Sequence, residues 1–278
     1  LASHFEEKFS DTNPIQETYG YDNNIVAAFV EADIFLSKDI AFKAGLRTDY
    51  SELFKTMNVA PRLSLAYKTG KSSQLSVAYG NFYQNPSSDI LKFNQNLRAQ
   101  NTAHYILNYQ YNADRKIFRA EAYYKDYKNL VKYDTEFTQF DSNYDSNGYG
   151  YAQGIDLFWR DSKSIKNIDY WVSYSLLDTK RDYRNYLNEA QPNFANTHNL
   201  SIVGKYWIND WRSQVGFSYA FASGRTYTDP NTTGFLNQTT KPYNSLSINW
   251  AYLISPQKIL YASVNNVLGF KNVNGYQY

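Results

Sequence analysis

Apolar and polar residues alternate along residues 25–50. Every second position from 26 to 36 is apolar, and the positions between them include Glu31 and Asp33. After a short polar break the alternation resumes at Ile40, and Lys43 and Arg47 lie among the intervening residues. Successive side chains of a β-strand point to opposite faces of the sheet. The pattern therefore predicts two strands, each with one apolar face and one charged face.

The same alternation continues to the end of the chain and predicts about twelve strands. Their expected ranges are 25–36, 40–50, 59–68, 73–84, 102–112, 116–132, 149–161, 167–180, 197–208, 211–223, 243–254 and 257–268. Several of them exceed the usual strand length of about 5–6 residues. No long segment has the period of a helix, and we expect only residues 88–98 to form one or two helical turns, within a loop. The predicted fold class is therefore all-β.

The connections between the predicted strands alternate in length. Short turns are expected near 37–39, 68–72, 112–115, 161–167, 209–210 and 255–257, and longer polar connections at 51–58, 85–101, 136–148, 181–196 and 224–242. In an antiparallel sheet this order places the short turns at one end and the long loops at the other. Outer-membrane β-barrels have this asymmetry, with short periplasmic turns and long extracellular loops. The pattern favours such a barrel over a soluble meander.

Composition indicates which face of these strands meets lipid. The 278 residues are only 43% hydrophobic, with a mean hydropathy of −0.61, and no run approaches the roughly 18 apolar residues of a membrane helix. Yet 18% of the residues are aromatic. In the predicted register Tyr67, Tyr109, Trp159, Tyr206 and Trp250 collect near the short turns, and aromatic rings favour the membrane–water interface. We expect an antiparallel transmembrane β-barrel with apolar rows facing lipid and charged rows lining a wet interior.

Charged residues on the predicted inner faces are the first candidate binding residues. They are Glu31, Asp33, Arg47, Arg62, Arg119, Glu121, Asp156 and Arg160. Acidic residues two positions apart on one strand share a face, so the pair at 31 and 33 could hold a cation. The alternative is an ordinary solvated wall, in which that pair is neutralised by Lys43, Arg47 or Arg62 from neighbouring strands.

Aromatic and polar residues in and beside the long connections are the second set of candidates. They are Phe82, Tyr83, Tyr144, Tyr149, Arg225 and Tyr227. Aromatic faces combined with amide and hydroxyl donors suit sugars, chelates or peptides. They also suit plain solvated loops, and the residue types alone do not choose between these two interpretations.

Other kinds of chemistry have no clear basis in the sequence. His4, His104 and His198 lack metal-ligand spacing, and the absence of cysteine leaves no disulfide or cysteine metal site. There is no glycine-rich phosphate loop, and a net charge of +2 does not indicate nucleic acid. We expect no cofactor, no metal and no catalytic constellation.

Several segments resemble one family. "APRLSLAYKTG" with "QLSVAYGNFYQNP", "GIDLFWR", "PNFANTHNLSIVGKYWI", "ASGRTYTDPN" and "SVNNVLGFKNVNGYQY" are similar, in this order, to the C-terminal half of the barrel of TonB-dependent outer-membrane receptors, with the Bacteroidetes type most similar. The resemblance covers nearly the whole chain. It implies a 22-stranded barrel closed around an N-terminal plug domain, and a TonB box ahead of the plug that couples it to TonB.

The resemblance also implies a function and a place in the cell. Members of this family span the outer membrane and import scarce ligands such as siderophores, haem, cobalamin or glycans. The charged inner residues would then contact a ligand or the plug, and a surface lipoprotein is a further candidate partner. No segment of the sequence reads as a plug or TonB box. We therefore expect residues 1–278 to be the C-terminal portion of the barrel domain.

Strand parity supports the same expectation. Twelve strands that begin at residue 25 would place both chain ends on the long-loop side, so we expect an open, curved sheet whose first and last strands do not pair. Two other functions stay open. One is a structural or docking barrel without transport, and the other is a small barrel enzyme, such as a lipase, using Ser76 and His104 as nucleophile and base.

Overall fold

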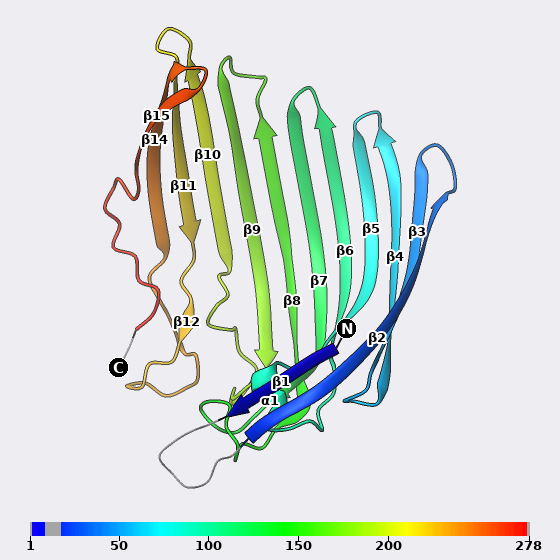
Figure 1. Ribbon diagram of the computed structural model, residues 1–278. Helices are drawn as coiled ribbons and strands as arrows, with labels where there is room; N and C mark the ends of the chain where they lie inside the picture. Colours follow the sequence, from blue (N-terminus) through cyan, green and yellow to red (C-terminus); the bar gives the residue numbers. More distant parts are fainter. Residues whose placement is uncertain (1, 9–17, 277–278) are drawn as a thin grey trace.

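The computed structural model describes residues 2–8 and 18–276, and in it the chain forms a 13-stranded sheet and a separate two-stranded hairpin (Figure 1). The strands of the large sheet are β1 (Ala2–Lys8), β2 (Thr18–Phe35), β3 (Ile40–Ser51), β4 (Thr56–Gly70), β5 (Ser73–Gln84), β6 (Gln100–Ala113), β7 (Lys116–Lys132), β8 (Asp145–Asp161), β9 (Ile168–Asp182), β10 (His198–Ile208), β11 (Ser213–Ala222), β14 (Tyr243–Ser255) and β15 (Lys258–Val264). The hairpin consists of β12 (Thr226–Tyr227) and β13 (Gln238–Thr239), and α1 (Ser88–Leu91) is a short helix.

All twelve predicted strands form, which confirms the all-β antiparallel fold. The helical turn expected within residues 88–98 is also present, as α1. In the part of the chain that the structure describes, no helical segment has the length and hydropathy needed to cross a bilayer. The alternation located the strands because each of them has one apolar and one polar face, so the period of two is visible along the whole element.

The strand count needs one correction, because β1 was not predicted. Its sequence, "ASHFEEK", has no apolar row, and it pairs only with the first part of β2, from Thr18 to Asn24. Residues 25–36 are therefore not the first strand, since β1 precedes them and runs toward the long loops. The large sheet therefore has thirteen strands, and not the twelve from which both chain ends were expected on the long-loop side.

The strands of the large sheet follow one another in sequence order, interrupted only by the small hairpin. Each is antiparallel to its neighbour, from β1 at one edge to β15 at the other. The two edge strands do not pair with each other, so the sheet is open, and Figure 1 shows it as a curved wall. This confirms the expected open, curved sheet.

Turn lengths separate the two ends of the wall. One end has only short connections, such as the one between β6 and β7, where Asp114 and Arg115 both have positive φ values of 52° and 59°. Two such residues form the two-residue turn whose twist matches that of the flanking strands. The opposite end carries α1, the β12–β13 hairpin and the long loops (Figure 1).

The long-loop end also contains a small apolar core. Ile90, Leu97 and Val131 are buried there, with Tyr144 packed against them. Leu91 is 1% exposed and Leu130 is 4% exposed, so the loop between β5 and β6 packs against the end of β7. The buried apolar residues of the described chain include none of the aliphatic rows at the centre of the sheet.

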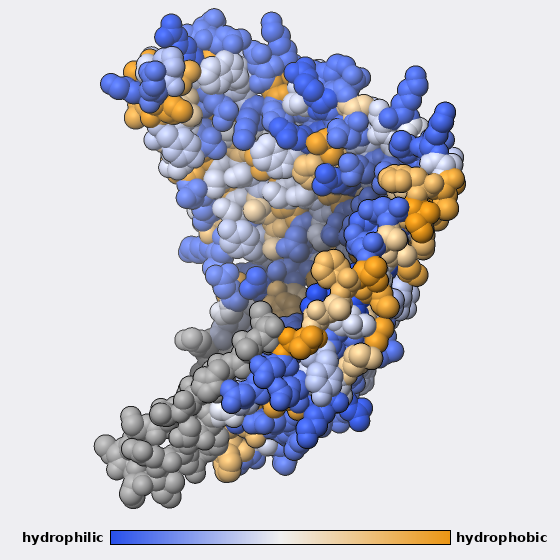
Figure 2. All heavy atoms as spheres, turned by 45° about the vertical axis from the view of Figure 1, so that its right-hand side comes forward, coloured by the Kyte–Doolittle hydropathy of each residue, from blue (hydrophilic) through white to orange (hydrophobic). Residues whose placement is uncertain are grey.

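Those aliphatic rows lie together on one face, which we call the outer face. Leu65 pairs with Phe42 on β3 and with Val77 on β5, and Val77 pairs with Leu107 on β6. Leu65 and Val77 are 39% and 46% exposed. In Figure 2 hydrophobic residues follow the flank that carries β2, β3 and β4, while the hollow beside it is mostly hydrophilic. The aliphatic rows are therefore not a protein core, as the barrel interpretation requires.

Candidate functional site

The other face of the sheet, which we call the inner face, brings the predicted charged residues together. Strand register fixes this arrangement, because directly opposed residues of paired strands point to the same side. Asp33 lies opposite Lys43, Arg62 opposite Gly45, and Glu121 opposite Asp156. By the same alternation all eight predicted residues lie on the inner face, namely Glu31, Asp33, Arg47, Arg62, Arg119, Glu121, Asp156 and Arg160.

One group of inner-face charges lies on β2 and β3 and is largely neutralised within the sheet. The Lys43 ammonium is 2.9 Å from the Glu31 carboxylate and 3.3 Å from that of Asp33. Arg47 Nε lies 3.9 Å from the Asp49 carboxylate. The alternative of a solvated, ion-paired wall therefore describes this group well. All these side chains are substantially exposed except Asp49, so the pairs contribute little to stability.

A second group stacks rings and cations where β4, β5 and β6 meet. The Arg62 guanidinium lies 4.7 Å from the centre of the Phe82 ring, and that ring lies 4.5 Å from the His104 imidazole. Together with Glu31 and Lys43 they line a hollow of about 220 Å³. Phe82 therefore belongs to the wall of the interior and not to an outer loop.

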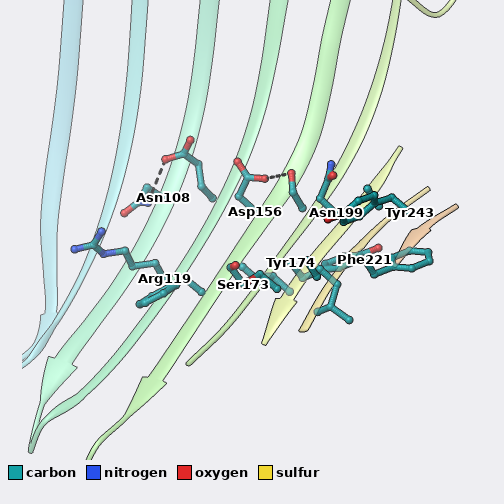
Figure 3. Close-up of a pocket in the computed structure, with 16 residues that line it drawn as sticks. Asn108, Arg119, Asp156, Ser173, Tyr174, Asn199, Phe221 and Tyr243 are labelled. Atoms are coloured by element: carbon teal, nitrogen blue, oxygen red, sulfur yellow. Dashed lines mark hydrogen bonds between the residues drawn. The ribbon is translucent and has the colours of Figure 1, made fainter. Parts of the chain in front are cut away.

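A hollow of about 540 Å³ on the inner face spans β6 to β14 and is lined by several of the predicted site residues. Its lining residues come from seven strands, β6–β11 and β14 (Figure 3). Asn108 donates a hydrogen bond to Glu121 at 3.4 Å, and Ser175 donates one to Asp156. Arg119 also lines the hollow, and in the described part of the chain its guanidinium has neither an ion pair nor a hydrogen bond.

Arg160 lies closer to the short turns, and its hydrogen-bonding groups have partners within the sheet. Its guanidinium donates two hydrogen bonds to the Asp169 carboxylate, at 3.0 Å and 2.7 Å. It also lies 5.8 Å from the Trp171 ring, and Lys205 lies 5.1 Å from the same ring. A bidentate pair of this kind fixes the geometry of both side chains. The inner face thus offers amides, hydroxyls and carboxylates together with the guanidinium of Arg119, a set suited to non-covalent contacts.

The nucleophile and base suggested for an enzyme do not meet. Ser76 lies opposite Asn108, whereas His104 lies opposite Gly80, four positions further along β5, or about 13 Å at the rise of a strand. His198 lies on the outer face, where its Nδ1 is 2.9 Å from the Tyr174 hydroxyl. Over the described ranges no three acidic or histidine side chains lie close enough to hold a metal ion.

The six predicted outer-end residues lie in different surroundings. Phe82 and Tyr83 belong to β5, Tyr149 to β8 and Tyr227 to β12, so four of the six lie in strands and not in loops. Tyr149 shares the outer face with Ile155 and is 50% exposed. Tyr144 packs against the apolar core of the long-loop end, and Arg225 Nε donates to the Asn196 side chain at 3.3 Å. Ligand contact by these residues stays a prediction.

One cluster at the long-loop end was not predicted. The Arg181 guanidinium lies 4.4 Å from the Tyr127 ring, 5.4 Å from Phe194 and 5.6 Å from Tyr183. Its Nε is buried without a hydrogen-bond partner, so the rings supply its contacts. The nearby Tyr186 is half-buried, its ring lies 4.8 Å from that of Tyr183, and this partial burial raises the pKa of its phenol to about 12. The aromatic content of "RDYRNY" was visible, but contact with residue 127 depends on tertiary structure.

Comparison with known proteins identifies relatives of this architecture. Residues 4–267 match the family described as "TonB dependent receptor-like, beta-barrel". The ferric enterobactin receptor of Pseudomonas aeruginosa superposes with a TM-score of 0.73 at 15% identity, over 90% of this chain and 40% of that one. The outer membrane transporter YddB of Escherichia coli gives 0.73 at 12% identity, over 91% and 42%.

A third solved structure has the same fold at a similarly low sequence identity. The FrpB iron transporter of Neisseria meningitidis gives a TM-score of 0.70 at 14% identity, over 89% of this chain and 40% of that one. Identities this low establish the fold alone. The chain spans less than half the length of each of these solved proteins. No curated protein sequence matches it.

Proposed function

Because the chain belongs to the family of TonB-dependent receptor-like β-barrels, we propose that it forms part of the wall of a receptor that imports a scarce ligand. Its strands cross the outer membrane. The proposal rests on one observation above the others, which is an open wall with a lipid-type outer face and a charged, hollowed inner face. That wall is the shape of a segment of a wide barrel, and it has room on its inner side for further protein.

In this proposal residues 1–278 are the C-terminal portion of the barrel domain. A plug domain from the same receptor fills the interior and reaches TonB through its TonB box. The inner-face residues hold the plug or the ligand by ion pairs and hydrogen bonds, and no covalent chemistry takes place. Arg119 is the strongest candidate for a plug contact, because the sheet itself leaves its guanidinium unpaired.

The ligand proposed is a siderophore, haem, cobalamin or a glycan. The solved relatives are named for ferric enterobactin and for iron, which makes an iron chelate the first ligand to test. The outer-end residues Tyr83, Tyr144, Tyr149, Arg225 and Tyr227 are proposed contacts, and Phe82 would act from the interior wall. A surface lipoprotein is a further proposed partner.

A growth screen tests this function directly. The gene of the full-length receptor is deleted, and the strain is grown with limiting iron, haem, cobalamin or single glycans. We expect a growth defect under one of these limitations, restored by the intact gene but not by a copy without its TonB box. Growth equal to the parent strain under every limitation would contradict import and would favour the structural or docking barrel.

A further inference from the structure

The short-turn end of the wall carries an excess of positive charge. Its turns and the residues that directly flank them contain eight lysines or arginines and four aspartates. The cations are Lys38, Lys71, Arg115, Lys116, Lys163, Lys166, Arg212 and Lys258, and the anions are Asp39, Asp114, Asp161 and Asp210. The whole chain has a net charge of only +2. The short-turn rim, as we call this set of residues, is therefore basic while the rest of the chain is slightly acidic.

Two of the four aspartates form ion pairs with lysines of the rim. Lys116 lies 3.6 Å from the Asp161 carboxylate, and Lys163 lies 3.1 Å from that of Asp114. Asp161 also accepts hydrogen bonds from the backbone N–H groups of Lys163 and Ser164, at 2.8 Å and 2.9 Å. These carboxylates hold the turns in shape, so they do not cancel the charge of the remaining cations.

The other cations are exposed and lack ion pairs. In the described residues no carboxylate lies within 4.0 Å of the side chains of Lys38, Lys71, Arg115, Lys166, Arg212 or Lys258. They come from all six short connections, from the β2–β3 turn at one side of the wall to the β14–β15 turn at the other. The charge is thus spread along the curve of the sheet and is not gathered in one pocket.

Aromatic rings on the outer face mark the position of the membrane surface relative to this rim. Tyr109 and Phe118 have ring centres 6.1 Å apart, and Phe118 and Trp159 have theirs 6.3 Å apart, which makes a row of rings across β6, β7 and β8. Trp250 stacks on Tyr252 further along the sheet. Such rings sit at the headgroup boundary. The cationic turns lie beyond these rings, at the ends of the strands.

We propose that the short-turn rim binds the anionic headgroups of phospholipids in the leaflet on that side of the membrane. Charge and continuity both favour this occupant, since the cations follow the same curved boundary as the lipid-facing rings. An acidic protein partner would need one basic sector, whereas a lipid boundary needs cations along its whole length. Basic residues at a membrane surface attract anionic lipid, by roughly fivefold in affinity for each cation close to the headgroups.

The test uses the full-length receptor, since the inference rests on the outer-membrane assignment of this chain. The receptor is placed in nanodiscs of phosphatidylcholine with a minor share of phosphatidylglycerol. Phosphatidylglycerol retained after delipidation is counted by native mass spectrometry. The rim variant combines Lys38→Gln, Lys71→Gln, Arg115→Gln and Lys166→Gln. The control combines Lys55→Gln, Arg98→Gln, Lys241→Gln and Lys271→Gln, four exposed cations at the long-loop end with the same loss of charge.

The wild type and the control are expected to retain phosphatidylglycerol above its share in the nanodisc. In the rim variant this enrichment of phosphatidylglycerol is expected to fall at least tenfold. Equal retention in the wild type and the rim variant would overturn the proposal, and so would an equal loss in the control. A wild type without any lipid preference would also overturn it and would leave an acidic protein as the partner of the rim. Heat-dependent gel mobility shows that each variant is folded, and growth on the limiting ligand tests import separately.

Discussion

At the scale of single residues, the orientation of a side chain is set by its parity along the strand. All eight charged candidates lie on the inner face, because their positions have the parity that points inward on each of their strands. Their partners were only partly predictable. Pairing of Lys43 with Glu31 and Asp33 follows from adjacent strands, but the stacking of Arg62 on Phe82 depends on rotamers that no pattern specifies.

Placing a charge on each face measures this orientation. Val77→Arg exposes a guanidinium to lipid and is expected to lower the free energy of unfolding by about 2–4 kcal/mol if the site is near the bilayer midplane. Ser76→Arg is the matched control, because its side chain lies on the inner face opposite Asn108, and it should cost much less. The measurement is denaturant unfolding of the receptor in vesicles, and equal losses for the two variants would contradict the assignment of the faces.

Arg119 provides a residue-scale test of the plug contact. Arg119→Gln is expected to make the plug of the full-length receptor more sensitive to protease, because a hydrogen-bonded charge that loses its partner costs about 1–3 kcal/mol. Gln110→Ala is the control, since Gln110 lies directly opposite on the same face but has no charge. Limited proteolysis with the plug fragment followed over time gives the readout. Unchanged cleavage in Arg119→Gln would remove this residue from the proposed contacts.

At the scale of elements, neighbouring strands approach closely at Gly154 on the inner face of β8. A Cβ atom on Gly154 would lie 2.2 Å from the Leu176 carbonyl oxygen and 2.6 Å from the Tyr123 hydroxyl. The Tyr123 ring covers this glycine from β7. At Gly45, by contrast, the nearest atoms would be 3.7 Å away, which is an ordinary contact. The sheet therefore needs glycine at residue 154 and tolerates a larger residue at residue 45.

Gly154→Ala is expected to destabilise the receptor by roughly 1–3 kcal/mol, because backbone or ring must move to admit the methyl group. Gly45→Ala should be neutral or slightly stabilising, since alanine loses less backbone entropy on folding. Both substitutions add the same group to the inner face of a central strand. Comparing their unfolding midpoints tests the close approach, and a larger loss at Gly45 would contradict it.

The loop between β9 and β10 is held by Arg181. Each aromatic ring that contacts the Arg181 guanidinium should contribute about 0.5–1 kcal/mol to stability at a partly exposed site. The backbone N–H groups of Arg181 and Ala190 also each donate to the other's carbonyl, at 2.9 Å and 3.1 Å. Arg181→Ala is expected to accelerate amide exchange across residues 183–197. Lys180→Ala, one residue away with its side chain on the outer face, should leave exchange unchanged. Equal exchange in the two variants would show that the rings do not hold the loop.

Predictability at this scale follows from how local each element is. Twelve strands and the short helix could be predicted, because their patterns repeat within one segment. β1 could not, since seven mostly polar residues show no apolar row and gain their conformation by pairing with β2. The β12–β13 hairpin was missed for a similar reason, as two residues are too few to show a period. The Bacteroidetes type stays a prediction.

At the scale of the whole molecule, the edges of the wall determine what the chain can do alone. β1 covers β2 only as far as Asn24, so residues 25–35 of β2 have an open backbone edge, as does β15. Exposure of Phe29 at 78% and Ile259 at 67% shows how little covers these edges. Unpaired backbone groups in hydrocarbon cost several kcal/mol each, so an isolated wall is unstable in a bilayer.

The chain is therefore expected to fail as a membrane unit by itself. Residues 1–278, refolded into vesicles, should give neither a heat-modifiable band on gels nor protection from protease, whereas the full-length receptor should give both. A stable, protected monomer of this segment would mean that the two edges can meet. That result would favour a small barrel over the wide one proposed here.

The sequential order of the strands has a consequence for how such a wall is assembled. In the large sheet nearly every pairing joins strands separated by one connection, so the chain can form it hairpin by hairpin, with little loop-closure entropy at each step. Contacts between residues close in sequence also make folding fast. The two open edges are the exception. They would have to pair with the remaining strands of a barrel, which joins segments far apart along the chain. Barrel closure, and not strand formation, should then limit the rate at which the receptor reaches its final state.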